Sequence, residues 1–173
     1  MPNKISFWLI PKSPLKEQYQ SLIDRLAVEF DAPPFEPHVT LFFGFMRDLQ
    51  ASSEVIEVVC KEFSSIILHA KSIEHSGVFT KTLFVQFQES LVLKELSHRL
   101  KSLSKSEDTY VLNPHLSLIY APLGKEVRDS LSKTILPLSE TLEFDEIVAV
   151  SCPERVENKE DVLCWKVLSR SKL

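Results

Sequence analysis

Apolar positions along the chain recur first at the spacing of a strand and then at the spacing of a helix. An apolar run from Ile5 to Ile10 predicts a short opening strand. Between residues 14 and 30, apolar side chains follow one another three or four positions apart, which predicts an amphipathic helix. Ser13 is expected to cap this helix, and Pro14 to occupy its first position, where no backbone N–H is needed.

Similar patterns continue to the end of the chain without an intervening linker. They predict helices at residues 52–63, 90–103 and 124–134. They predict strands at residues 64–74 and 83–88 and a closing antiparallel pair at 144–150 and 161–168. In the last strand Leu163, Trp165 and Val167 are expected to share a face, and the charged run 154–160 before it to be a solvated loop. Helices and strands mixed in this order indicate an α+β fold.

One pentapeptide occurs twice in slightly altered form. Residues 37–41 read Pro-His-Val-Thr-Leu, and residues 114–118 read Pro-His-Leu-Ser-Leu. In each copy a histidine is followed two positions later by a hydroxyl residue, within an apolar run that predicts a strand. The remaining histidines lack a hydroxyl two positions on and are expected to be surface or structural residues, namely His69, His75 and His98.

The spacing within each copy has a geometric consequence. Side chains at positions i and i+2 of a strand point to the same face, so His38 and Thr40 share one face and His115 and Ser117 another. Brought together, these faces supply two imidazoles and two hydroxyls around one small cavity. One imidazole can take a proton from water and the other can protonate a leaving oxygen, while the hydroxyls hold non-bridging phosphate oxygens. Histidines with pKa values near the ordinary value of about 6.5 suit this work, and the sequence does not tell which one is the acid.

With these motifs, the chain resembles the two-histidine (2H) phosphoesterase superfamily, and within it the small cyclic phosphodiesterases of plant and fungal type. The resemblance covers nearly the whole chain. Besides the two motifs it rests on residues 8–11 (Trp-Leu-Ile-Pro), the turn 76–79 (Ser-Gly-Val-Phe) and the run 113–121, which ends in Ile-Tyr-Ala. It implies a two-lobed α+β fold with pseudo-two-fold antiparallel sheets flanked by helices and an active-site cleft between the lobes. The whole chain, residues 1–173, would form one domain of two intertwined lobes.

The resemblance also implies chemistry. It suggests hydrolysis of ADP-ribose 1″,2″-cyclic phosphate or nucleoside 2′,3′-cyclic phosphates, without a metal ion or another cofactor. It places Tyr120 near the substrate, although a tyrosine packed at the strand end would fit the sequence equally well. Trp8 could form a wall for a base or ribose, or belong to the core.

Composition favours a small substrate over a long nucleic acid. The net charge is −4, so the sequence gives no indication of a broad basic surface that would bind a polynucleotide. Only three glycines occur, which argues against a phosphate-cradling P-loop or a dinucleotide fold. Two alternatives stay open: an RNA-end 2′,3′-cyclic phosphodiesterase or 2′–5′ ligase-like enzyme, and a non-catalytic nucleotide-binding module. We expect the protein to be a monomer.

The cysteines and the ends of the sequence give indications of the cellular compartment. The three cysteines form no Cys-x-x-Cys pair and are expected to be buried or half-buried thiols in a reducing compartment, namely Cys60, Cys152 and Cys164. No third ligand at metal-binding spacing accompanies either motif histidine. No long apolar segment or signal peptide is apparent, so no membrane association is expected. The final Ser-Lys-Leu (171–173) matches a peroxisomal address that has meaning only in a eukaryote, and we expect a cytoplasmic protein.

Overall fold

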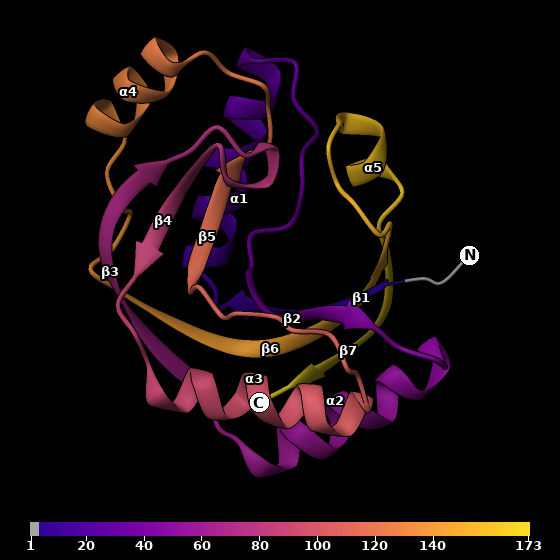
Figure 1. Cartoon of the computed structure of the whole chain (residues 1–173). Coiled ribbons are helices and arrows are strands. Elements are labelled where there is room, and N and C mark those ends of the chain that lie inside the picture. The colour runs from indigo at the N-terminus through magenta and orange to yellow at the C-terminus, as the bar shows by residue number, and fades with distance from the viewer. Residues whose placement is uncertain (1–3) are drawn as a thin grey trace.

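The computed structural model describes residues 4–173, in which seven antiparallel strands form one sheet flanked by helices (Figure 1). The strands are β1 (Lys4–Pro11), β2 (Val39–Phe45), β3 (Ile66–His75), β4 (Leu83–Phe87), β5 (His115–Ile119), β6 (Thr141–Cys152) and β7 (Lys166–Lys172). The α-helices are α1 (Leu15–Glu29), α2 (Ser52–Glu62), α3 (Leu91–Ser104), α4 (Lys125–Thr134) and α5 (Lys159–Leu163). Two 3₁₀ turns, η1 (Leu49–Ala51) and η2 (Phe79–Lys81), complete the elements.

The sheet folds back on itself because β6 belongs to both of its halves. The strand order is β1-β2-β5-β4-β3-β6-β7, and β1 also pairs with β6. One edge of β6 pairs with β1, while the other pairs first with β3, through residues 141–144, and then with β7, through residues 146–151. One half-sheet is thus β2-β1-β6-β7, and the other is β5-β4-β3 with the start of β6. This arrangement confirms the α+β, two-lobed prediction.

Helices α1 to α4 pack against this curved sheet. Figure 1 shows α2 and α3 side by side along one side of it, and α3 packs on β2 while α2 packs on β7. Helix α1 contacts β5, and α4 contacts β3. The apolar spacing explains the packing, because α3 buries Leu93, Leu96 and Leu100 on one face. Each predicted helix is confirmed to within one or two residues at its ends.

The predicted cap of α1 is wrong. Pro14 occupies the N-cap position, and no side chain caps the helix there. The Ser13 hydroxyl instead donates to the carboxylate of Glu17, at 2.6 Å. A charged acceptor one turn along the helix therefore competes successfully for the hydroxyl that the sequence assigned to capping. Helix α3 shows the expected type of cap, since the Ser90 hydroxyl accepts from the backbone N–H of Leu93.

The predicted final strand is wrong over its first residues. The antiparallel pairing of the last two strands is confirmed, but β7 begins only at Lys166. Asp161 and Leu163 lie in α5, which begins because the Asn158 side chain accepts from the backbone N–H of Asp161. Leu163 is therefore 63% exposed and shares no strand face with Trp165.

The cysteines and the remaining histidines take varied environments. Cys152 is buried, Cys60 is half-buried and Cys164, at the end of α5, is exposed, so the prediction was wrong for Cys164. His69 and His98 are exposed, and His75 pairs with Asp129 at 2.9 Å. No helix in residues 4–173 is long and apolar enough to cross a membrane.

Candidate active site

The two motif strands meet at a single backbone pair. Val39 of β2 lies opposite Leu116 of β5, and both side chains are fully buried in the core. Since neighbouring residues of a strand point to opposite faces, the residues flanking this pair point away from the core. These flanking residues are His38, Thr40, His115 and Ser117. The pairing explains how two distant segments of the chain bring both histidines to one place.

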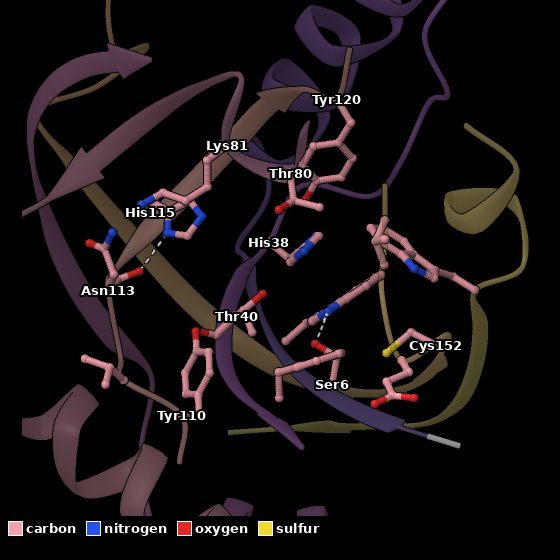
Figure 2. Close-up of a pocket in the computed structure, with 16 residues that line it drawn as sticks. Ser6, His38, Thr40, Thr80, Lys81, Tyr110, Asn113, His115, Tyr120 and Cys152 are labelled. Carbon is pink, nitrogen blue, oxygen red and sulfur yellow. Dashed lines mark hydrogen bonds between the residues drawn. The ribbon is translucent and has the colours of Figure 1, made fainter. Parts of the chain in front are cut away.

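A cavity with a volume of about 380 Å³ lies at this place (Figure 2). Of the residues predicted for the site, its lining includes Trp8, His38, Thr40, His115 and Tyr120. Figure 2 shows the imidazoles of His38 and His115 near each other, and both line the cavity. The cavity is large enough for a small ligand and brings five of the six predicted residues together.

Each imidazole is held by a backbone carbonyl two residues earlier. The Nδ1 atom of His38 lies 2.7 Å from the carbonyl oxygen of Glu36, and Nδ1 of His115 lies 2.7 Å from that of Asn113. A carbonyl can only accept, so both Nδ1 atoms donate and both Nε2 atoms carry the lone pair in the neutral ring. Both histidines therefore present the same nitrogen for proton transfer.

Burial changes the proton affinity of both rings. It lowers the pKa of His38 to about 4, against the opposing effect of the hydrogen bond to Glu36 and with a further lowering by the charge of His115. Burial also lowers the pKa of His115, where the bond to Asn113 opposes the shift and the charge of Lys81 adds to it. The expectation of nearly ordinary pKa values was wrong, because the sequence does not reveal how deeply the rings are buried. The free protein holds His38 neutral at pH 7.

The two aromatic residues predicted for the site have different partners. The Trp8 ring stacks on the imidazole of His38, with centroids 3.8 Å apart and an interplanar angle of 10°. Its Nε1 atom donates to the Ser6 hydroxyl at 2.8 Å, which fixes the plane of the indole. Tyr120 stacks on Phe35 with centroids 4.0 Å apart. Both rings line the cavity while being almost fully buried, so each is at once part of the core and part of the wall.

The two motif hydroxyls differ in their surroundings. Thr40 lines the cavity. Ser117 is buried outside the lining, and its hydroxyl donates to the carbonyl of Thr80 at 3.0 Å. Burial raises the pKa of Tyr120 far above its usual range, and a hydrogen bond to Ser117 opposes the rise. Contact of Ser117 with a ligand would require its side chain to turn away from Thr80.

One family of proteins matches the chain along its whole length. The family model described as cyclic phosphodiesterase-like protein matches residues 1–173. The chain belongs to this family. With it the chain belongs to the 2H phosphoesterase superfamily, and it is a phosphodiesterase enzyme.

The individual proteins that resemble this chain are distant from it in sequence. A cyclic phosphodiesterase of Arabidopsis thaliana is 23% identical over 138 residues, which cover 80% of this chain and 76% of the relative. E. coli LigT in complex with 3′-AMP superposes with a TM-score of 0.63 at 11% identity, covering 100% of this chain and 99% of LigT. Kluyveromyces marxianus Usb1 gives a TM-score of 0.52 at 16% identity, covering 96% and 98%. The structural likenesses show a shared fold.

Several lining residues of this family member were missed from the sequence. Lys81 follows the turn at residues 76–79, and its ammonium lies 5.0 Å from the centroid of the Phe84 ring. Tyr110 donates to the carbonyl of Thr40 at 3.1 Å. The ring of Trp165 lies 6.2 Å from that of His38, edge to face. None of these has a local sequence signal, because tertiary packing alone brings them to the cavity.

A metal ion would need several His, Cys, Asp or Glu side chains close to one another. Within residues 4–173, no three such side chains gather closely enough to hold one. Cys152 lines the cavity, and burial raises the pKa of its thiol to about 12. The thiol is therefore protonated at neutral pH.

Proposed function

We propose that the protein hydrolyses ribose cyclic phosphates by acid/base catalysis between His38 and His115, without a metal ion. The substrate would be ADP-ribose 1″,2″-cyclic phosphate or a nucleoside 2′,3′-cyclic phosphate. One observation carries the proposal: both rings line the same cavity and both donate Nδ1–H to a carbonyl at 2.7 Å, so both Nε2 atoms are available for proton transfer.

The reaction needs two proton transfers and one displacement at phosphorus. The Nε2 atom of one imidazole removes a proton from water as the water oxygen attacks phosphorus. The bond between phosphorus and one ribose oxygen breaks, and the Nε2–H of the other, protonated ring gives its proton to that oxygen. The product is a phosphomonoester with a free neighbouring hydroxyl. The base has gained one proton and the acid has lost one, so exchange with water restores the enzyme.

The negative charge of the bound substrate can keep the acid imidazole protonated. Both ring pKa values are lowered in the free protein. A phosphodiester anion beside an imidazole favours its charged form and raises its pKa, so the bound substrate brings one ring into its protonated state. Thr40 is the hydroxyl that lines the cavity and would donate to a non-bridging oxygen. The Ser117 hydroxyl would donate to the same phosphate after turning away from Thr80. The rings of Tyr120 and Trp8 would form walls beside the substrate.

The charges around the cavity favour a small substrate. Lys81 and Glu154 both belong to its lining, one cation and one anion, on a chain of net charge −4. A channel for a long RNA strand normally carries several cations that follow the backbone. E. coli LigT, which shares the fold, forms complexes with 3′-AMP, ATP and NADP⁺, so this architecture can accommodate nucleotides of modest size.

The test uses a panel of cyclic phosphates with phosphorus NMR as the readout. The protein is incubated with ADP-ribose 1″,2″-cyclic phosphate, nucleoside 2′,3′-cyclic phosphates and a short RNA ending in a 2′,3′-cyclic phosphate, each with and without EDTA. We expect ring opening of the small substrates, unchanged by EDTA. His38→Ala and His115→Ala should each lower turnover by roughly 10²–10⁴-fold. Near-wild-type turnover in either variant, or activity that EDTA abolishes and a divalent ion restores, would refute the mechanism.

The same panel separates the alternatives. Opening of the RNA end alone would identify an RNA-processing enzyme. Because the family is one of phosphodiesterases, the alternative of a non-catalytic module is set aside, and binding of nucleotides without turnover would place the physiological substrate outside this panel.

A further inference from the structure

A cluster of ion pairs is centred on Glu36, the residue whose backbone carbonyl bonds the His38 imidazole. The Glu36 carboxylate accepts from both terminal nitrogens of Arg170, at 2.9 and 2.7 Å, and pairs with Lys16 at 3.0 Å. Arg170 in turn reaches Glu146 at 3.2 Å. The partners come from α1, β6 and β7, and the Glu36 side chain is only 19% exposed. The cluster therefore ties three elements to one residue of the segment that precedes β2.

The segment that carries Glu36 is held by side-chain contacts and not by a strand ladder. Besides the ion pairs, the Gln20 amide donates to the carbonyl of Phe35 at 3.0 Å, and the Phe35 ring stacks on Tyr120. Residues 32–38 belong to no helix or strand, and the ladder of β2 begins only at Val39. Yet the carbonyl of Glu36 is the group that accepts the Nδ1 hydrogen of His38 at 2.7 Å. The position of this carbonyl decides both the orientation of the ring and which nitrogen bears the hydrogen. The Glu36 ion pairs are therefore among the side-chain contacts that take the place of a ladder, and they are the ones made by the residue that bonds His38.

The other histidine is supported differently. His115 lies within β5, opposite Gln86 of β4. The Gln86 amide donates to the Asn113 side chain and to the carbonyl of Pro114, both at 2.9 Å. Asn113 is the residue whose carbonyl holds His115. One half of the site is thus supported by neutral amides and the other by ionised groups, although the bonds to the two rings are alike.

We propose that Glu36 is a positioning residue for catalysis: anchored by Arg170 and Lys16, it keeps its carbonyl where it fixes the ring and tautomer of His38. The inference rests on the proposed role of His38 in proton transfer. An isolated surface ion pair contributes little to stability, but this carboxylate is bidentate, only 19% exposed and bonded to two cations. Burial alone would raise the pKa of Glu36, yet the bonds from Arg170 and Lys16 outweigh it and lower the pKa, so the anchor is ionised at neutral pH.

The main test compares Glu36→Gln with Glu62→Gln. Glu62 forms the same kind of bidentate pair with Arg99, at 2.7 and 2.6 Å, between α2 and α3 and outside the cavity lining. Both variants lose one arginine–carboxylate pair. We expect Glu36→Gln to lower kcat about tenfold with little change in KM, since misplacing a catalytic group weakens the transition state more than substrate binding. Glu62→Gln should keep the wild-type kcat.

A second readout does not depend on turnover. Nitrogen-15 NMR at pH 7 reports which ring nitrogen of each histidine carries hydrogen, and the His38→Ala spectrum assigns the His38 signals. In the wild type and in Glu62→Gln, His38 should be the Nδ1–H tautomer. In Glu36→Gln a substantial share should become Nε2–H, while His115 stays unchanged. This readout remains valid even if the protein opens none of the cyclic phosphates, so failure of the proposed function and failure of this inference are distinguishable.

Arg170→Lys serves as the conservative variant and as a safeguard against misfolding of Glu36→Gln. A lysine keeps the charge but offers a single ammonium in place of the planar fork, so kcat should lie between those of the wild type and Glu36→Gln. The proposal would be overturned if both variants kept the wild-type kcat and the wild-type tautomer of His38. If Glu36→Gln does not fold, a wild-type kcat and an unchanged His38 tautomer in Arg170→Lys would be enough to overturn it.

Discussion

Acid should destabilise the folded protein through His38 in particular. Burial lowers the pKa of this ring from the ordinary value of about 6.5 to about 4 in the folded state. Between these values the unfolded chain binds a proton at His38 that the folded protein does not bind. Stability therefore falls as the pH drops from about 6.5 and stops falling, for this group, below about 4. With His38 only 5% exposed, the linkage amounts to about 3 kcal/mol between pH 7 and pH 4.

Urea denaturation at pH 7, 6, 5 and 4 measures this loss. Replacing His38 with Gln removes the titrating group and retains an amide that can donate to the Glu36 carbonyl, so the free energy of unfolding should fall by about 3 kcal/mol less than in the wild type. Part of the loss remains in the variant because the pKa of His115 is lowered as well. His98→Gln, at an exposed position, is the matched control and should behave as the wild type. Equal losses in wild type and His38→Gln would refute the reasoning.

Other substitutions test the cavity wall. Thr40→Val keeps the shape of the side chain but removes the hydroxyl that lines the cavity. The kcat/KM for a cyclic phosphate should fall by a factor that corresponds to a loss of transition-state stabilisation on the order of 1.5–3 kcal/mol. Ser117→Ala should lose less, because the Ser117 hydroxyl is already bonded to Thr80; a larger loss than in Thr40→Val would show that Ser117 is the stronger phosphate ligand. Lys81→Met removes a charge that lowers the pKa of His115, so an NMR titration of that ring should show a raised pKa, and KM for the anionic substrate should increase. An unchanged titration would place the Lys81 charge too far from the ring to matter.

The parts of the site that could be predicted are those with a local pattern. The alternation around His38 and His115 fixes which side chains share a face, and that holds wherever the strands end up. Trp165 and Lys81 reach the cavity only through tertiary packing, so nothing in their neighbourhood distinguishes them. The catalytic roles of the motif residues remain predictions that the variants above must test.

The fold was predicted to a similar extent. Long amphipathic helices such as residues 91–104 were found because one face repeats over several turns. The short helix α5 was missed because a cap at Asn158 decided its start, while its apolar residues also fit the alternation of a strand. The lowered pKa of His38 was missed for a third reason, since burial depends on the indole and the other rings packed around it.

The shared strand β6 has a consequence for biosynthesis. The motif strands β2 and β5 join the two half-sheets through one backbone pair, and β6 joins them a second time by pairing with β1 and β3. All motif residues precede residue 141, whereas Cys152, Glu154 and Trp165 of the cavity lining belong to β6 or follow it. A nascent chain arrested with residues 141–173 still inside the ribosome would carry every motif residue and yet lack part of the cavity wall. The cavity can therefore be completed only after β6 and the residues that follow it have left the ribosome.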